Sequence, residues 1–236
     1  MIQHREEFLE TIGNSLKRTV NTKVKPQRNW KYAPQKKGYQ GLSQDDLLEI
    51  LEKQCDKIHT DVVTTTVKDL PNALEQVVDQ YGGGPISMWQ DSRFDDYNLK
   101  PLYEEKWPNK GYDVSKWFPE LGEQNIQNAE KANIGLTFSE YVLAESGTVV
   151  LFSDQAHGKS VGLLPNNFIA IVKKSMIVPR MTQVAELLNK RIESGESLPS
   201  AIDFVSGPSN SADIEMKLVV GVHGPIHATY IILMDE

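Results

Sequence analysis

The stretch that decides the fold class runs from residue 134 to residue 152 and reads Ile134-Gly-Leu-Thr-Phe-Ser-Glu-Tyr-Val-Leu-Ala-Glu-Ser-Gly-Thr-Val-Val-Leu-Phe152. It holds three apolar segments, 136–138, 141–144 and 148–152, which are candidate strands or buried segments. Because no helix separates them, strands formed here are neighbours in the chain. We therefore expect part of the sheet to be antiparallel.

Outside this stretch, strand and helix patterns alternate. Apolar residues recur at helical spacing in several segments, and Ser43 with Asp46 has the form of a capping box that begins another helix. The expected helices are 1–18, a helix from residue 43, 69–81 and 182–194, and the other expected strands are 61–67, 85–89, 168–172, 201–205 and 226–234. Such alternation indicates an α/β protein with a layered sheet.

Composition narrows the class of protein further. The chain has 236 residues, of which 39% are hydrophobic, so it is long enough to bury a sizeable core. The one cysteine, Cys55, excludes an internal disulfide and any iron–sulfur or Cys-rich zinc site held by this chain alone. No apolar run approaches a membrane span, and no signal peptide is visible at the start. We expect a cytoplasmic protein.

Charge is distributed unevenly along the chain. Residues 1–42 hold nine Lys and Arg against three Glu, a net charge of +6, and since the whole chain carries −7 the rest carries −13. Between Lys17 and Leu42 lie eight basic residues and no acidic one, with Trp30, Tyr32 and Tyr39 among them. A nucleic-acid tail is one interpretation, but the acidic remainder would repel phosphate. We therefore expect a docking arm on a neighbouring subunit or on the chain itself, which allows a homo-oligomer.

The first candidate site is Glu145-Ser-Gly-Thr148, between two apolar segments. Glu145 has three possible roles there: a nucleophile, a general base, or an acceptor for backbone N–H groups. The alternative interpretation is a strand connection whose glutamate lies in solvent.

The second candidate site is Ser206-Gly-Pro-Ser-Asn-Ser-Ala-Asp-Ile-Glu215. It follows a predicted strand, and Asn210 with Asp213 has the spacing of a capping box, which predicts a short helix. A Gly/Ser-rich turn before a helix N-terminus is typical of an anion site. A capped helix start without a ligand is the alternative, and Asp213 and Glu215 would repel an anion that they faced.

The third candidate site is Gly221-Val-His-Gly-Pro-Ile-His227. His223 and His227 have the spacing of a zinc-binding pair on a helix, but Gly224-Pro225 prevents that helix. We therefore expect no metal site. His223 is left as an acid/base candidate if it lines a pocket, or as a turn residue bound to backbone.

Four motifs together resemble one known family. Phe138-Ser-Glu-Tyr-Val-Leu-Ala-Glu-Ser-Gly-Thr148, Leu163-Leu-Pro165, Ser206-Gly-Pro-Ser-Asn-Ser-Ala-Asp-Ile-Glu215 and Gly221-Val-His-Gly-Pro225 occur in the order and spacing of the LUD-domain family. The resemblance covers about residues 43–236 and implies a domain there, preceded by a helix and basic arm over 1–42. It also implies a three-layer α/β/α sandwich with a mixed, mostly parallel sheet, similar to the NagB/RpiA/CoA-transferase group.

The resemblance also implies a function. It points to lactate utilization, the oxidation of L-lactate to pyruvate by a system of three proteins, of which the other two carry iron–sulfur clusters. The single cysteine agrees with a subunit that carries no cluster of its own. The resemblance further implies a subunit of an oxidising system rather than a stand-alone catalyst, with no cofactor bound by this chain. An acyl- or CoA-transferase-like or ligase-like enzyme that uses Glu145 is the alternative.

If the chain serves lactate utilization, we expect the three candidate sites to line one polar pocket at the carboxyl edge of the sheet. That pocket would be open to a small anionic ligand or to a partner. Glu145 and His223 are then the catalytic candidates. The ligand-binding candidates are Gly147, Thr148, Gly207, Pro208, Ser209, Asn210, Ser211, Asp213 and Glu215. Asn210 and Ser211 stand where the family pattern has Arg and Thr, which removes a bidentate partner for a carboxylate. Lys159, Arg180 or backbone N–H groups would have to replace it.

Overall fold

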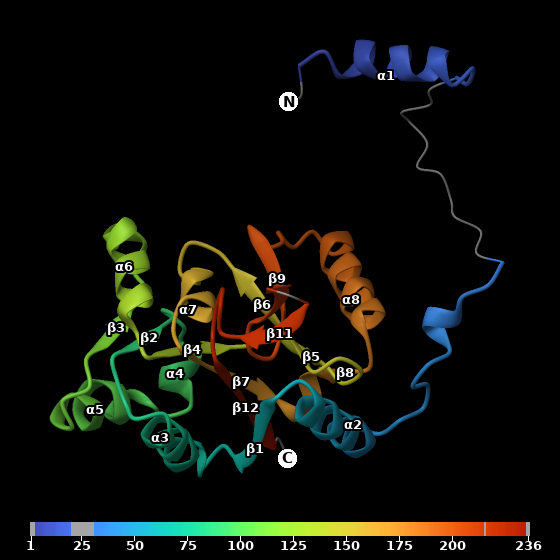
Figure 1. The fold of residues 1–236 in the computed structure, drawn as a ribbon. Helices are drawn as coiled ribbons and strands as arrows, with labels where there is room; N and C mark the ends of the chain where they lie inside the picture. The colour runs from blue at the N-terminus through green and yellow to red at the C-terminus, as the bar shows by residue number, and fades with distance from the viewer. Residues whose placement is uncertain (1–2, 20–30, 215, 235–236) are drawn as a thin grey trace. The chain divides into compact units, whose positions relative to one another are not determined.

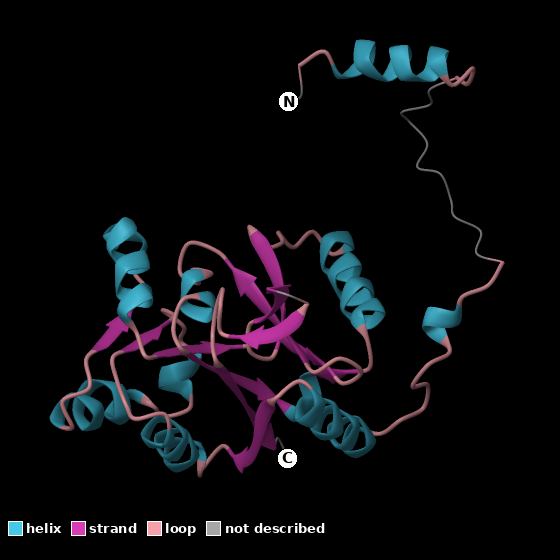
Figure 2. Cartoon of the chain, viewed as in Figure 1, coloured by secondary structure: helices cyan, strands magenta, loops and turns pink. Residues whose placement is uncertain are grey.

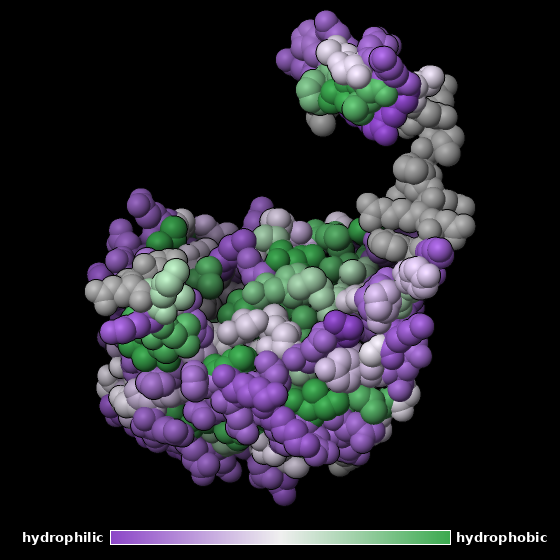
Figure 3. All heavy atoms as spheres, turned by 45° about the vertical axis from the view of Figure 1, so that its right-hand side comes forward, coloured by the Kyte–Doolittle hydropathy of each residue, from purple (hydrophilic) through white to green (hydrophobic). Residues whose placement is uncertain are grey.

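The computed structural model describes residues 3–19, 31–214 and 216–234, and the chain divides into two units, Met1–Lys37 and Gly38–Glu236. The first unit holds helix α1 (Arg5–Ser15) and a short 3-10 helix (Pro34–Lys36). Apolar side chains of Phe8, Ile12 and Leu16 are exposed in this unit, and Figure 3 shows green atoms gathered along one side of its helix. The amphipathic helix is therefore confirmed. Residues 20–30 of the basic arm, Trp30 included, lie outside the described residues.

The second unit is built on a parallel sheet. Within the described residues this sheet has six strands in the order β1-β12-β7-β4-β2-β3, and each neighbouring pair is parallel (Figure 1). The strands are β1 (Thr60–Thr66), β2 (Ile86–Met88), β3 (Val114–Lys116), β4 (Ile134–Phe138), β7 (Asn167–Lys173) and β12 (His227–Met234).

Helices cover both faces of this sheet, as strand β4 shows. Successive side chains of a strand point to opposite faces. A Cβ on Gly135 would lie 1.9 Å from the carbonyl oxygen of Val161, in helix α7 (Ser160–Leu163), whereas the ring of Phe138 packs 4.8 Å from the ring of Phe94, in helix α4 (Arg93–Asp96). The predicted α/β class with layered helices is confirmed.

The antiparallel pairing expected after residue 134 forms a separate sheet. Strands β5 (Tyr141–Leu143), β6 (Thr148–Ser153) and β9 (Ala201–Ser206) pair antiparallel, and the short β8 (Ile177–Val178) joins β5 in parallel. The resemblance implied one mixed sheet. In the structure, the parallel and the mixed pairings belong to two different sheets. Figure 2 shows the strands as magenta arrows among the cyan helices.

The remaining helices lie around the two sheets. Helix α3 packs on β1 and β12, α6 on β2 and β3, and α2 on β1 and β8. Their bounds are α2 (Gln44–Lys57), α3 (Leu70–Gln80), α5 (Trp107–Asn109), α6 (Glu123–Lys131) and α8 (Met181–Glu193), with a π-helix over Leu102–Lys106 and 3-10 turns over Pro119–Leu121 and Lys174–Met176. No helix in the described part of the chain is long and apolar enough to cross a membrane.

Local signals explain several of these boundaries. Ser43 and Asp46 form the predicted capping box at the start of α2, with each side chain bonded to the other residue's backbone N–H. Gly82 and Gly83 adopt φ of +83° and +81° after α3, a conformation that favours glycine. The two glycines therefore end helix α3, next to the expected end of that helix at residue 81.

The helix predicted from the Asn210–Asp213 spacing is wrong. Asn210–Ile214 is strand β10, which pairs antiparallel with β11 (Lys217–Val220) in a two-stranded sheet. The capping-box spacing is a local preference, and it was overridden because the apolar segment at 218–220 supplies a partner strand.

Candidate functional site

Two of the predicted motifs meet where β6 pairs with β9. Thr148 lies opposite Ser206, and their hydroxyl oxygens are 2.7 Å apart. The hydroxyl of Thr148 is also 2.6 Å from that of Ser146. These hydroxyl groups bond to one another; Thr148 is buried, whereas Ser206 is exposed.

Tyr230 connects the same motifs to the parallel sheet. Its phenol oxygen accepts a hydrogen bond from the backbone N–H of Gly207 (2.9 Å) and donates to the carbonyl of Gly147 (3.1 Å). Tyr230 is fully buried on β12, and burial raises the pKa of its phenol above the ordinary value. The hydroxyl therefore stays protonated, as a donor to Gly147 must.

Glu145, the predicted nucleophile or base, forms an ion pair with Arg180. Nε of Arg180 lies 2.6 Å from Oε2 of Glu145, and the two side chains are 31% and 38% exposed. The carboxylate is therefore a hydrogen-bond acceptor for a guanidinium, and it also stays reachable from solvent. Neither a nucleophilic nor a basic role for Glu145 is tested by this geometry.

The second and third motifs also contact each other. The N–H of Ser209 donates to the carbonyl of Pro225 (2.8 Å), and a Cβ on Gly224 would lie 3.1 Å from Cβ of Ser209. Pro208 is buried, whereas Asn210 is exposed and donates from its side-chain amide to the carbonyl of Pro208 (3.0 Å).

The other predicted residues of these motifs are less closely joined. Ser211 is buried in β10, opposite Val219, and His223 is exposed on the turn before β12. The side chain of Asp213 and the whole of Glu215 lie outside the described residues.

The expected place of this cluster, the carboxyl edge of the sheet, is wrong. A Cβ on Gly207 would lie 2.4 Å from Oγ1 of Thr60, the first residue of β1, and Pro225 directly precedes β12. Both neighbours are at the amino edge. The physical reason is connectivity: residues 206–225 lead from the smaller sheet into the start of a parallel strand.

The carboxyl edge holds a different polar cluster, at the point where the sheet's connections diverge. From β2 the chain leaves toward β3, and from the neighbouring β4 it leaves toward β7 on the other side. Ligands of open parallel α/β sheets bind in the crevice that opens where two such connections part. Residues 91–133, which supply part of this crevice, show no clear helical or strand period, so the sequence did not predict it.

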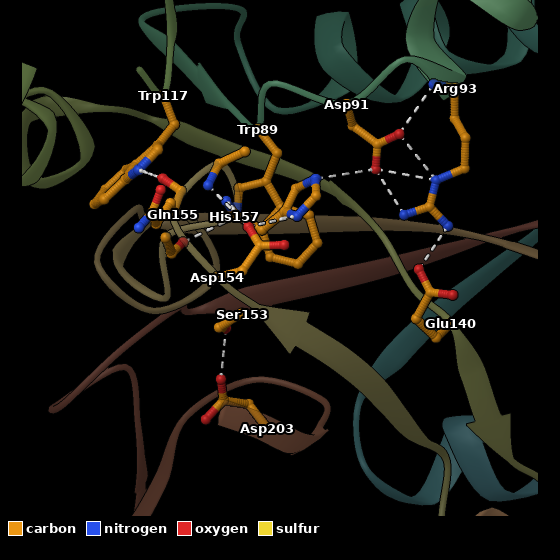
Figure 4. A network of polar contacts seen from close by, with 12 residues as sticks. Trp89, Asp91, Arg93, Trp117, Glu140, Ser153, Asp154, Gln155, His157 and Asp203 are labelled. Atoms are coloured by element: carbon orange, nitrogen blue, oxygen red, sulfur yellow. Dashed lines mark hydrogen bonds and ion pairs between the residues drawn. The ribbon is translucent and has the colours of Figure 1, made fainter. Parts of the chain in front are cut away.

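An arginine bridges this crevice. Nε and Nη2 of Arg93, at the start of α4, donate to the two oxygens of Asp91 over 2.6–3.0 Å, and Nη1 lies 2.8 Å from Glu140, which follows β4 (Figure 4). The Asp91 side chain is only 5% exposed. Burial alone would lower the pKa of Arg93, but the two carboxylates outweigh it and raise that pKa.

His157 joins the same cluster from the loop after β6. Its Nδ1 lies 3.0 Å from Asp154 and its Nε2 3.6 Å from Asp91, while its ring packs 4.9 Å from that of Trp89 (Figure 4). Among the described residues, Nε2 is a buried nitrogen without a hydrogen-bond partner. A histidine that lies beside carboxylates is a combination that can serve in acid/base catalysis.

The loop that carries His157 is fixed at several points. Trp89 donates from its indole to the carbonyl of Gly158 (2.9 Å), and Lys159 forms an ion pair with Asp203 (2.8 Å). Burial alone would raise the pKa of Asp154, but backbone N–H groups and His157 lower it below the ordinary value. Because Lys159 is paired with Asp203, it is not free to replace the family's arginine as a partner for a ligand carboxylate.

Two observations concern side chains that could ligate a metal ion. Cys55 is buried on α2, and burial raises the pKa of its thiol to about 12. In the described part of the chain, no three His, Cys, Asp or Glu side chains converge on a point that could hold a metal ion.

Comparisons with known proteins place this α/β fold in a family. The family model of the LUD domain matches residues 48–233. Lactate utilization protein C of Geobacillus sp. (strain WCH70) is 52% identical over 235 residues, covering 100% of this chain and 98% of that protein, and the protein of that name from Bacillus subtilis (strain 168) is 49% identical over the same shares. The chain belongs to the LUD domain family, which confirms the resemblance.

A solved structure supports the fold. The crystal structure of a DUF162 family protein from Deinococcus radiodurans matches with a TM-score of 0.55 and 16% sequence identity, over 81% of this chain and 99% of that one. At this identity the likeness concerns the fold alone.

Proposed function

We propose that this chain takes part in lactate utilization. It acts in the cytoplasm as the cluster-free member of a three-protein iron–sulfur system that oxidises L-lactate to pyruvate. The observation that carries the proposal is the full-length identity of 49–52% with proteins named lactate utilization protein C. Identity of this extent includes the N-terminal helix and arm as well as the α/β unit, so the likeness extends beyond the sheet and its core.

The chemistry of the chain supports a role without clusters. An iron–sulfur cluster needs several thiolates, and this chain has one cysteine, whose thiol stays protonated in the folded protein. The electrons removed from lactate would therefore pass to clusters on partner subunits.

Within this proposal, the motif segment at 206–225 serves partner docking rather than anion binding. The N–H groups of Gly207 and Ser209 already donate to Tyr230 and Pro225, which leaves them unable to hold an anion. The β10–β11 hairpin meanwhile exposes apolar side chains, Leu218 by 62% and Met216 by 95%. Exposed apolar side chains grouped on one element are typical of interaction sites.

A deletion strain complemented with variants tests the proposal. We expect the deletion to abolish growth on L-lactate as sole carbon source and the wild-type chain to restore it and to co-purify two iron–sulfur proteins. Leu218→Asp should reduce this co-purification, while Ile192→Asp, an exposed apolar residue of α8, should not. Normal growth of the deletion strain on L-lactate would refute the proposal.

A further inference from the structure

Strand β1 forms one edge of the six-stranded sheet, and its outer side is open. On its inner side the strand pairs with β12 over its whole length, and among the described residues no backbone hydrogen bond joins residues 60–65 to any other segment. In an edge strand, alternate N–H and C=O groups point away from the neighbouring strand. Asp61 and Thr64 are exposed, and β1 holds neither proline nor lysine that would block a further strand. An open edge of this length is a template for the addition of another strand.

Three carboxylates lie beside this edge. Glu52 and Asp56 of α2 and Asp61 of β1 line a cavity of about 460 Å³, to which β1 also contributes Val62 and Val63. The described residues that line it include no lysine or arginine, and within the described chain none of the three carboxylates has an ion-pair partner. The open edge and this cavity together, which we call the β1 groove, therefore carry uncompensated negative charge.

A metal ion and a second β1 strand both fit this groove poorly. Among the residues that the structure describes, no three His, Cys, Asp or Glu side chains converge on a point that could hold a metal ion. Pairing with the β1 edge of another copy would bring that copy's carboxylates to the same edge, where like charges repel. Carboxylates spread beside a strand edge match several cationic side chains on one extended segment instead.

This chain contains a segment of that kind. Residues 17–42 hold eight basic residues and no acidic one. Within them, the proline-free stretch 27–33 is as long as β1, and each of its residues keeps the N–H that pairing with a strand needs. Aromatic residues are favoured in strands. The stretch contains two basic and two aromatic residues, Arg28, Trp30, Lys31 and Tyr32.

The path of the chain favours a segment from a second copy. Helix α2 packs on β8 as well as on β1, and a Cβ on Gly38 would lie 3.3 Å from Nη1 of Arg180, two residues after β8. The chain therefore enters α2 from the side of β8, whereas the β1 groove is lined by β1 and α3. The segment of a second copy reaches the groove without passing around α2.

We propose that the β1 groove binds the basic segment 17–42 of a second copy of this chain. The segment adds a strand beside β1 and directs its lysine and arginine side chains to Glu52, Asp56 and Asp61. Because each copy carries one groove and one segment, reciprocal exchange closes a two-fold dimer. The inference does not rest on the proposed function, since it concerns the purified chain alone.

Sedimentation velocity of the purified full-length chain tests the exchange. We expect a dimer whose dissociation constant rises at least about tenfold between about 50 and 500 mM NaCl, because salt screens ion pairs at the surface. Asp56→Asn combined with Asp61→Asn should weaken the dimer about three- to tenfold. Glu130→Gln combined with Glu193→Gln is the control, since it removes the same charge from exposed positions on α6 and α8 and should leave the dimer unchanged.

Two further measurements locate the contact. Hydrogen exchange followed by mass spectrometry should show the amides of residues 61–65 protected in the dimer and exchanging faster after dilution to the monomer, while the amides of β11 stay unaltered. An excess of a synthetic peptide with the sequence of residues 17–42 should dissociate the dimer. The same peptide with its eight basic residues replaced by glutamine should not.

Three results would overturn the inference. The first is a monomer whose β1 amides exchange freely, and the second is a monomer whose β1 amides are protected, which would mean that the segment occupies the groove of its own chain. The third is a dimer that responds neither to salt nor to Asp56→Asn combined with Asp61→Asn. Each of these results leaves the proposed role in lactate utilization standing, because that role is tested by growth and co-purification.

Discussion

Replacing Tyr230 with Phe removes one oxygen atom from the point where two of the family's motifs are joined to the parallel sheet. In the wild-type protein that oxygen accepts from the N–H of Gly207 at 2.9 Å and donates to the carbonyl of Gly147 at 3.1 Å. All three residues are buried, so water cannot replace the lost partner. The substitution leaves the packing of the ring unchanged and isolates the effect of the hydroxyl.

The expected loss of stability follows from the two groups left behind. A buried donor or acceptor without a partner costs about 1–3 kcal/mol, and a carbonyl is the more tolerant of the two. We expect Tyr230→Phe to lower the free energy of unfolding by about 2–3 kcal/mol, which for a chain of this length corresponds to a fall in Tm of about 5–10 °C.

Urea denaturation followed by tryptophan fluorescence measures this change. The midpoint should fall while the slope m stays constant, because the surface exposed on unfolding is unchanged. Tyr141→Phe is the matched control, since among the described residues the Tyr141 hydroxyl has no hydrogen-bond partner; we expect a change within about 0.5 kcal/mol. If Tyr230→Phe is as stable as this control, the hydroxyl does not hold the motifs together and the reasoning fails.

Three further predictions concern titration, packing and the crevice. The folded pKa of the Cys55 thiol, about 12, lies above its unfolded value, so its stabilising contribution is complete below about pH 8.5 and is lost as the pH rises. The stability deficit of Cys55→Ala relative to wild type should therefore shrink by about 1 kcal/mol between about pH 9 and pH 10 in urea titrations; a constant deficit would contradict this. Gly135→Ala places a Cβ 1.9 Å from a backbone oxygen of α7 and should lower the stability by about 1–3 kcal/mol or more. Gly162→Ala is the control, because its Cβ would be 3.4 Å from its nearest neighbour, and thermal unfolding should show a far smaller loss of stability. Asp91→Asn removes the carboxylate that holds Arg93 and should lower stability by about 1–3 kcal/mol, and an unchanged urea midpoint would show that the pair is not structural.

Much of the fold was predictable because its signals are local. The capping box of Ser43 and Asp46, the apolar stripe of α3 and the glycines at 82 and 83 each depend on contacts within a few residues. The order of the six parallel strands was not predictable, because it depends on which crossovers pass over which face of the sheet. The three-residue strands β2 and β3 are also too short to show a period, although the segment that contains β2 was recognised from its apolar run.

The candidate site was predicted in part. The structure brings Gly147, Thr148 and Gly207 together and shows Ser209 against Gly224, but at the amino edge of the sheet. The hairpin at β10 and β11 was missed, because Asn210 carries a cap signal whose outcome is decided by a partner strand. The catalytic roles assigned to Glu145 and His223 stay predictions.

The sequence by itself determined the class of fold, the position of most helices and strands, the family, and the absence of thiols for a cluster. These follow from composition and from patterns that depend on neighbouring residues. Only the tertiary structure decided that Arg93 and Glu140 meet across a crevice and that His157 lies between Asp91 and Asp154. The reason is that strand order sets which distant loops share an edge, and no local pattern records that order.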